Sequence, residues 1–446
     1  MKYSVIKRKN KIKEAIESDE IRSWCRLEGQ NTFTRNRKIP CKDLIYLSLN
    51  NKSKTTSIEI RDYEKNLKGN DNVTYTEEAY LKQRRHLNPL VFKRLNNVFL
   101  CSFYNETPDE VSTVKGYILL GIDGSKYEIP NTPKNREYFG FQTNQSKDTV
   151  PARANTSSVY YLKNKFYCDV TIDTYNSNEK ALAKKNIEQT LKIIPNQKKI
   201  YIMDRNYVSL EFLLWLNARN LNYIFRLNKS SYKQEVESMN TNDEYISIKH
   251  TKERLKKIKK NYPEEAKKLE QLKETKVRVT KATLSNAEEI RILSNLSYDE
   301  FNQDDIVNLY SERWGIEKSY DTMKNKLKSE SFTGNLPIII EQDLYAQVLI
   351  FNQVQDMINE ANIKLKEKNK KTKFEYQINI NKAIGIFKDE FIKILLIDDK
   401  NISRRKYEEL VNEMTNYVTA IRLNRPSKPR KFNHSNKYRT NMKPSY

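Results

Sequence analysis

Glycine, histidine and long apolar runs are scarce in this chain of 446 residues. With only nine glycines and no GxxxxGK[ST] stretch, the sequence argues against a glycine-rich phosphate loop. No segment approaches the roughly 18 consecutive apolar residues of a membrane-spanning helix, so we expect no membrane partner. The stretch MKYSVIKRKNKIK at the start is charged and lacks an apolar core, which argues against a signal peptide.

Cysteine is also sparse. The chain has four cysteines, no CxxC pair and only three histidines, a spacing that argues against a zinc site. The pattern is typical of ordinary reduced thiols, so we expect a cytoplasmic protein.

Negative charge falls well short of positive charge. The 81 Lys and Arg exceed the 57 Asp and Glu, for a net charge of +24. Such an excess predicts a polyanionic partner, and nucleic acid is the commonest one. The alternative is a generic basic protein, such as a ribosome-associated one. An AT-rich genome would account for part of the lysine excess, because Asn, Ile and Tyr are abundant too.

The first unit of the chain, 1–112, is expected to be helical and basic. Thr74 and Glu77 fit a capping box that opens a helix. This helix would display three basic side chains, Lys82, Arg84 and Arg85. Exposed Arg and Lys on small helices suit a DNA-docking module of the helix-turn-helix type, and a solvated basic helix is the equal alternative.

The second unit, 113–229, changes to alternating strands and helices. KGYILLGIDGSKYEI predicts a buried strand that ends at Asp123, and KKIYIMDRNY predicts a strand that ends just before Asp204. The order strand, strand, strand, helix, strand, helix, strand indicates an α/β fold with a mixed sheet and flanking helices. Functional groups in such sheets lie at the carboxyl ends of strands, where both aspartates are predicted.

Three further units complete the chain. Residues 230–290 predict an inserted, strand-containing subdomain with a basic face, and a solvated pair of charged helices is the alternative. Residues 291–360 form the second part of the α/β core. Residues 361–446 are expected to be helical and to end in a basic tail, which from Arg422 onward carries eight Lys or Arg and no acid.

The stretch YSERWGIEKSYDTMK, residues 310–324, places four polar side chains at helical spacings. At about 100° per residue they fall within an arc of roughly 60°: Tyr310, Arg313, Glu317 and Lys324. Apolar side chains lie directly beside this stripe, on the face that would dock on the sheet. A merely solvated face would lie opposite the core, so the pattern favours a site at the edge of a cleft.

Three carboxylates are thus predicted at two strand ends and on one helix: Asp123, Asp204 and Glu317. Oxygen ligands of this kind can hold two Mg²⁺ ions, and Mn²⁺ would substitute. One ion activates the attacking water or hydroxyl, and the other stabilises the leaving oxygen. Arg313 could bind the phosphate with two hydrogen bonds, Lys324 would act as a point charge, and the Tyr310 hydroxyl could donate to a phosphate oxygen.

The YxxRxxxExxxxxxK pattern of residues 310–324 resembles the Tyr-Arg-Glu-Lys signature of DDE transposases of the hairpin-forming insertion-sequence group, the insertion-sequence-four type. IDGSK around Asp123 and IMDRNY around Asp204 are similar to that family's two aspartate motifs, and LSNL at 293–296 to a short motif before its third region. The order also matches, with 81 residues between the aspartates and 113 more to the Glu. Asn206 replaces the family's usual Gly; because Asn tolerates positive φ, we expect the turn to be kept.

The resemblance implies a ribonuclease-H-like catalytic core and a cut-and-paste DNA transposase. In that reaction a freed 3′-OH forms a hairpin on the opposite strand, the hairpin reopens, and the 3′-OH joins target DNA. The resemblance further implies an N-terminal region that helps to bind the terminal inverted repeats, a homodimer in the synaptic complex, and a place at the bacterial nucleoid. We expect Trp215 and Trp314 to be packing residues.

Three alternatives remain. A ribonuclease-H-like nuclease would cut DNA without joining it, but the Arg and Lys of the helical stripe favour the transposase. A catalytically silent, transposase-derived DNA-binding protein has no reason to keep all three carboxylates. A structural basic protein leaves the placement of those carboxylates unexplained.

Overall fold

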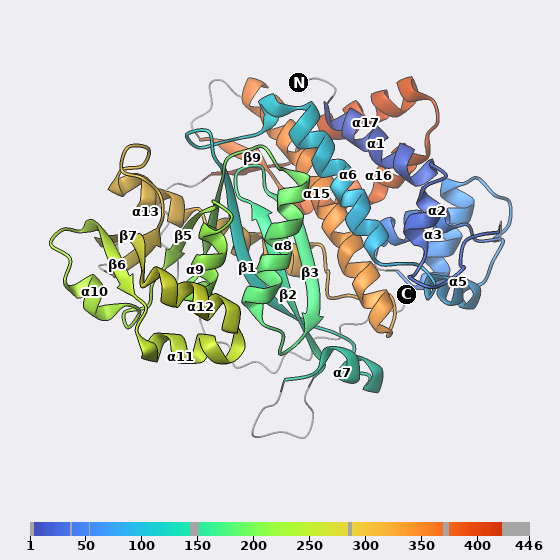
Figure 1. Ribbon diagram of the computed structural model, residues 1–446. Coiled ribbons are helices and arrows are strands. Elements are labelled where there is room, and N and C mark those ends of the chain that lie inside the picture. Colours follow the sequence, from blue (N-terminus) through green and yellow to red (C-terminus); the bar gives the residue numbers. More distant parts are fainter. Residues whose placement is uncertain are drawn as a thin grey trace.

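An eight-stranded mixed sheet forms the centre of the molecule, with strand order β3-β2-β1-β4-β5-β8-β7-β6. In this computed structural model, a helical region lies beside the β3 end of the sheet, and a smaller lobe surrounds the β6 end (Figure 1). The residues that the structure describes are 4–35, 38–52, 54–142, 151–283, 288–368 and 374–421. None of the helices in these ranges is long and apolar enough to cross a membrane.

Five strands make up the first part of the sheet: β1 (Ile118–Glu128), β2 (Arg153–Tyr161), β3 (Phe166–Thr174), β4 (Lys199–Met203) and β5 (Asn222–Arg226). β1, β2 and β3 are antiparallel neighbours, while β4 and β5 run parallel to β1. The first residues of β1 and the whole of β4 are buried, because helices cover both faces of the sheet. The predicted α/β fold, a mixed sheet with flanking helices, is confirmed.

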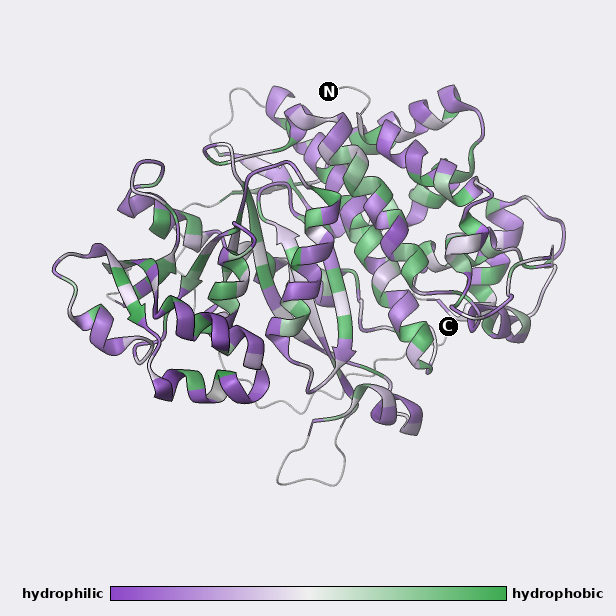
Figure 2. Cartoon of the chain, in the orientation of Figure 1, coloured by the Kyte–Doolittle hydropathy of each residue, from purple (hydrophilic) through white to green (hydrophobic). Residues whose placement is uncertain are grey.

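Helices pack on both faces of these strands. α8 (Glu179–Ile193) lies on β2 and β3, and the long helix α15 (Pro337–Lys368) packs against both β3 and α6 (Leu90–Glu106). The apolar residues of α6 and α15 gather where the two helices run side by side (Figure 2). Further helices are α2 (Ile21–Cys25), α3 (Cys41–Leu49), α4 (Thr56–Arg61), α7 (Pro133–Phe139), α9 (Leu210–Asn217), α10 (Lys233–Glu237) and α16 (Ile380–Leu396). A second, small sheet consists of β9 (Tyr376–Ile378) and β10 (Val418–Ala420).

The predicted strands of the inserted region are present, and they extend the central sheet. They are β6 (Asp243–Lys249), β7 (Glu274–Thr283) and β8 (Glu289–Ser294), and β8 pairs with β5. Two mostly hydrophilic helices, α11 (Lys252–Asn261) and α12 (Pro263–Leu272), lie at the surface of this lobe, and the second begins at a proline (Figure 2). The limits of the units themselves stay a prediction.

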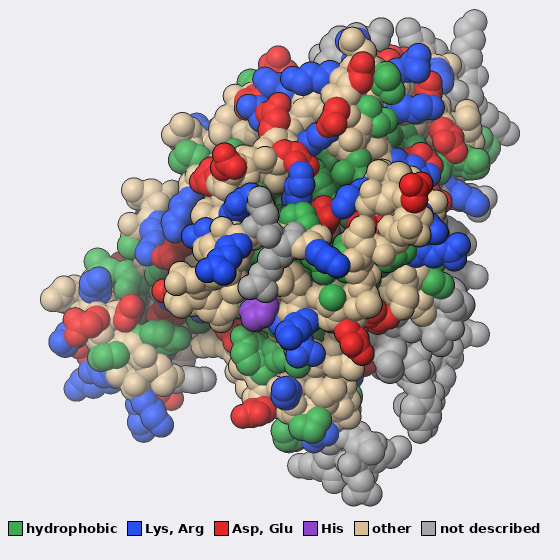
Figure 3. Space-filling model, turned by 90° about the vertical axis from the view of Figure 1, so that its right-hand side faces the viewer, with side chains coloured by type: hydrophobic (Ala, Val, Ile, Leu, Met, Phe, Trp, Pro, Cys, Tyr) green, Lys and Arg blue, Asp and Glu red, His purple; other side chains and the backbone are tan. Residues whose placement is uncertain are grey.

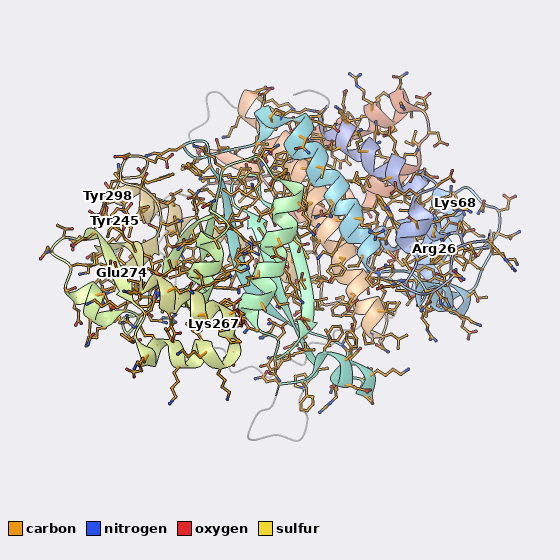
Figure 4. All side chains as sticks on the ribbon, in the orientation of Figure 1. Arg26, Lys68, Tyr245, Lys267, Glu274 and Tyr298 are labelled. Atoms are coloured by element: carbon orange, nitrogen blue, oxygen red, sulfur yellow. The ribbon has the colours of Figure 1, made fainter. Side chains whose placement is uncertain are left out.

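A buried arginine ties this lobe to the loop that precedes the predicted Glu helix. Arg278 of β7 makes a two-fold ion pair with Asp243 and donates to the carbonyl oxygens of Leu296, Ser297 and Phe301 at 2.8–3.2 Å. In the same loop, the ring of Tyr298 meets that of Tyr245 from β6 edge to face, with centroids 4.9 Å apart (Figure 4). Arg278 therefore ties the lobe to the loop that leads into the predicted Glu helix.

The N-terminal helix is locked to the end of the chain. α1 (Ser4–Glu17) places two buried cations against partners far along the sequence. Arg8 makes two hydrogen bonds of 2.7 and 2.8 Å to the carboxylate of Asp356 on α15. The Lys9 ammonium donates to the hydroxyl of Ser403 on α17 (Lys400–Met414). The first unit is helical, as predicted, but it does not fold apart from the last one.

The predicted start of the basic helix in this unit is wrong by two residues. α5 (Glu77–Arg84) begins after Thr76, whose side chain accepts a hydrogen bond from the backbone N–H of Ala79. The Thr74 hydroxyl instead donates to Glu64. Thr74 and Glu77 therefore form no capping box.

The expectation that this helix displays Arg84 is also wrong. Its side chain is 1% exposed and pairs with Asp343 of α15 at 2.8 Å, because α5 turns this face toward the core. Lys82 and Arg85 are exposed. Figure 3 views this side of the molecule and shows Lys and Arg mixed with Asp and Glu over the visible surface.

Candidate active site

Asp123 and Asp204 lie on neighbouring parallel strands at the same level. The register pairs Ile122 of β1 with Met203 of β4, and each aspartate is the next residue. The prediction that this strand ends at Asp123 is wrong, because β1 continues to Glu128 alongside β2. Asp204 does follow the end of its strand. The two carboxylates are therefore brought together where β4 stops.

The predicted Glu helix is not one uniform helix but three joined segments: α13 (Gln303–Ser311), α14 (Trp314–Asp321) and a π-helical turn, Thr322–Lys326. At the first joint the backbone tightens, since Arg313 N–H donates to the Tyr310 carbonyl and Ile316 N–H to the Arg313 carbonyl, both at 3.1 Å. At the second it widens, because Leu327 N–H reaches back to the Thr322 carbonyl at 2.9 Å. π turns of this kind are frequent at functional sites.

Close packing of α14 on β1 brings the glutamate to the aspartates. A Cβ atom at Gly121 would lie 3.1 Å from a methyl carbon of Leu162 and at an ordinary contact distance, 3.5 Å, from Ile316, so α14 packs directly over the strand at this residue. Side chains two apart on a strand share a face, and Asp123 therefore points to the side on which α14 lies. Glu317 follows Ile316 directly and reaches the same edge.

The electrostatics of Asp123 report this crowding of carboxylates. The pKa of Asp123 is raised from 3.8 to about 6: burial raises it most, the Gly124 N–H and the Arg313 guanidinium oppose the rise, and the negative charges of Glu317 and Asp204 add to it. The two neighbouring carboxylates thus disfavour ionisation of Asp123. A divalent cation would relieve that repulsion, so the donor set fits one.

Arg313 lies between the predicted phosphate-binding tyrosine and the predicted catalytic glutamate. Its Nη1 is 2.8 Å from Glu317 Oε1, and its Nε donates to the Tyr310 hydroxyl at 3.2 Å. The guanidinium also lies 5.2 Å from the centre of the Trp314 ring. The Trp314 ring is 54% exposed, so the expectation that it is a packing residue is wrong, whereas Trp215 packs against the core as predicted.

Lys324 does not lie with Tyr310, Arg313 and Glu317, as the helical wheel predicts, but beside the later residues of β1. Its ammonium donates to the Lys126 carbonyl at 2.5 Å, lies 3.5 Å from Glu330, and stands over the ring of Tyr127. The π turn rotates it toward the far end of β1, three residues beyond Asp123. The structure therefore groups Tyr310, Arg313 and Glu317 tightly and places Lys324 along the strand.

The comparison with known proteins identifies the family of this chain. Residues 115–353, more than half of the chain, match the family model described as the transposase DDE domain. The chain belongs to this transposase family. The sequence-based resemblance to DDE transposases of insertion sequences is confirmed, and members of the family cleave DNA and transfer strands.

The transposase is also similar to a transposase of a bacterial insertion sequence element. It is 23% identical over 344 residues to "Transposase InsG for insertion sequence element IS4" of Escherichia coli (strain K12), covering 75% of this chain and 74% of that protein. Among solved structures it matches a cryo-EM structure of the piggyBac transposase synaptic complex with hairpin DNA. That match has a TM-score of 0.43 and 11% identity, and covers 92% of this chain and 81% of the other.

Divalent metal ions are the usual cofactors of transposases with this domain. Within the described ranges, no group of three or more His, Cys, Asp or Glu side chains is already arranged to hold a metal ion. Glu317, one of the three predicted metal ligands, is paired with Arg313. The chemistry of the donor set still fits hard cations, because every donor is a carboxylate oxygen.

The sequence did not reveal several groups around these carboxylates. Tyr320 donates its hydroxyl to the Asp123 carbonyl at 2.8 Å and so fixes α14 to β1. Tyr207 is buried, and no described residue hydrogen-bonds its hydroxyl. Burial and the charges of Asp123, Glu179 and Asp204 hold the Tyr207 pKa well above its usual value. The IMDRNY motif was a signal for Tyr207, but nothing in the sequence pointed to Glu179.

The turn after Asp204 is kept in a different conformation from the one expected. Arg205–Tyr207 forms a single 3₁₀ turn, and Asn206 is absent from the described residues with positive φ. Its replacement of the family's usual Gly therefore needs no left-handed backbone here.

Proposed function

We propose that this transposase moves its element by cut-and-paste chemistry. It cleaves the element's ends to free a 3′-OH, passes through a hairpin on the opposite strand, and joins the 3′-OH to target DNA. The observation that carries this proposal is the convergence of Asp123, Asp204 and Glu317 at one sheet edge, with Arg313 and Tyr310 beside them. Hydrolysis or transfer of a phosphodiester needs this combination of metal ligands and phosphate-binding cations.

Asp123, Asp204 and Glu317 would hold the divalent ions, two Mg²⁺ per site with Mn²⁺ able to substitute. When bound, such ions activate the attacking oxygen and stabilise the leaving one. Arg313 would orient the scissile phosphate through its fork of N–H groups, with the Tyr310 hydroxyl as an additional donor. Lys324, beside the later residues of β1, would contact the neighbouring phosphate of the same DNA strand.

The partners in this proposal are double-stranded DNA at the terminal inverted repeats and at the target. Exposed Lys82 and Arg85 are candidate contacts to phosphate in the N-terminal region, and Arg84 is withdrawn from that set because it is buried. Joining two ends at once requires two active sites, so we infer a homodimer in the synaptic complex. Neutralising phosphates makes binding weaker as salt is raised.

The test is cleavage of a labelled duplex that carries the DNA flanking the gene, with Mg²⁺ or Mn²⁺. We expect metal-dependent release of a 3′-OH and of a hairpin, and loss of both in Glu317→Gln while DNA binding persists. Glu312→Gln is the matched control, since Glu312 lies five residues before Glu317, between α13 and α14, but pairs with Lys163 at 2.7 Å. Binding without any cleavage by the wild-type protein would contradict the proposal and favour a silent DNA-binding protein.

A further inference from the structure

The glutamate that the proposed function assigns to metal is already engaged in the DNA-free chain. Arg313 Nη1 lies 2.8 Å from Glu317 Oε1, and the Arg313 side chain is only 8% exposed. Tyr310 accepts from Arg313 Nε at 3.2 Å, and the guanidinium is flanked by the Tyr310 and Trp314 rings at 5.7 and 5.2 Å. The cation is thus held in place from three sides and aimed at the carboxylate.

An ion pair of this kind competes with a metal ion for the same oxygen. Hydrogen bonds between charged groups are short and strong, and they strengthen as water is excluded. A metal that binds Glu317 must therefore break the contact and leave a largely buried guanidinium without its anion. Removing one partner of a buried pair is costly, so the pair lowers the metal affinity of the free chain.

A phosphate group removes this obstacle. A guanidinium forms two parallel hydrogen bonds with phosphate as readily as with carboxylate. The Glu317 side chain is 32% exposed, so the pair is open to a ligand on that side. When Arg313 turns to a phosphate, its charge stays compensated and Glu317 is released.

Lys324, the second predicted phosphate-binding cation, is also paired with a carboxylate of the protein. Lys324 lies 3.5 Å from Glu330 and donates to a backbone carbonyl, so it too is held by the protein in the DNA-free chain. Both phosphate-binding cations are therefore compensated internally, one of them by a predicted metal ligand.

We propose that DNA gates the metal site: the Arg313–Glu317 pair masks the glutamate until a DNA phosphate takes Arg313. This proposal rests on the proposed function. Its consequence is a coupling between two ligands, in which DNA raises metal affinity and metal raises DNA affinity by the same factor. The chain would thereby avoid assembling a cleavage-competent centre before a phosphodiester is in place.

The decisive measurement needs no DNA and no catalysis. Mn²⁺ is titrated into the DNA-free full-length protein, and free Mn²⁺ is followed by electron paramagnetic resonance. We expect Arg313→Met, which removes the charge and keeps the length, to bind Mn²⁺ about tenfold more tightly than the wild type, within the usual range of such couplings.

The matched control is Lys163→Met. Lys163 pairs with Glu312, the residue next to Arg313, at 2.7 Å, so this variant removes an equal charge from an ion pair of similar length. We expect it to change Mn²⁺ affinity less than twofold. Equal affinities for Arg313→Met and Lys163→Met would mean that only net charge matters, and would overturn the proposal.

Asp123→Asn separates this proposal from the proposed function. If Asp123→Asn leaves Mn²⁺ binding unchanged, the carboxylates do not hold metal and the proposed function fails. If Asp123→Asn abolishes binding while Arg313→Met behaves as wild type, only the gate fails. Should Arg313→Met not fold, Arg313→Lys serves instead: a Lys four residues before a Glu makes the weaker orientation of the pair, so a smaller gain in Mn²⁺ affinity is expected and no gain refutes the gate.

The reciprocal measurement uses a fluorescent duplex that carries the DNA flanking the gene. Mn²⁺ should tighten its binding to the wild type by the same factor as DNA tightens Mn²⁺ binding. In Arg313→Met the two factors should be equal to each other and smaller than in the wild type. Coupling of undiminished size in that variant would contradict the gate.

Discussion

Arg84 provides the sharpest test of how this fold is held together. Its side chain is 1% exposed and makes an ion pair of 2.8 Å to Asp343, a hydrogen bond of 2.9 Å to Gln342 and one of 2.5 Å to Thr333. Arg84→Met leaves the Asp343 carboxylate buried without its cation, with only the Thr333 groups still donating to it. Breaking a buried pair in this way costs about 3–5 kcal/mol. That is a large share of the ~5–15 kcal/mol that separates folded from unfolded chains.

The assay is guanidinium chloride unfolding followed by circular dichroism, with DNA affinity measured on the same samples. Arg85→Met is the matched control: it removes the same charge from an exposed neighbour and should change stability by less than about 0.5 kcal/mol. Adding Asp343→Asn to Arg84→Met removes the orphaned charge and should recover about 2 kcal/mol; the Asp343→Asn single variant completes the cycle that gives the coupling of the pair. If Arg84→Met is as stable as Arg85→Met but binds DNA more weakly, Arg84 is a DNA contact and this reasoning is refuted.

Two further predictions concern burial and close packing. Burial lowers the pKa of Lys9 from 10.5 to about 8, so between pH 8 and 10.5 the unfolded chain binds the extra proton. Stability should therefore rise with pH across this window by at most about 3 kcal/mol, and Lys9→Met should flatten the rise in Tm measured against pH. An equally steep rise in the variant would contradict this. Gly121→Ala should lower Tm and cost about 1–3 kcal/mol of stability, because the added methyl group would lie only 3.1 Å from Leu162. Gly385→Ala, with open space in α16, should raise Tm, and a similar change in both variants would refute the packing argument.

Sequence patterns identified the strands of the core because burial on both faces leaves a local mark. The apolar run before Asp123 and the one before Asp204 each predict a strand without knowledge of its partner. Their register, which puts the two aspartates side by side, follows from parallel pairing of β1 with β4. Three acidic residues and an ordered set of motifs were therefore enough to indicate the candidate site.

Features that depend on distant partners left no such mark. Arg84 and its partner Asp343 are 259 residues apart, and a polar helix with a buried Arg has the same local pattern as one with an exposed Arg. The position of Lys324 was missed for a different reason. A helical wheel assumes a constant turn per residue, whereas the backbone tightens near Arg313 and widens into a π turn at Thr322–Lys326. Each change rotates all later side chains.

The locking of α1 to the end of the chain has a consequence for synthesis. The partners of Arg8 and Lys9 follow them by 348 and 394 residues. At roughly 10 residues per second, the first helix waits on the order of half a minute on the ribosome before Asp356 is translated. A product that stops short of Asp356 lacks one of the two carboxylate partners of buried Arg8 and keeps only Glu110, at 2.9 Å. Truncated copies of the gene would thus yield chains whose first helix lacks its contacts to Asp356 and Ser403.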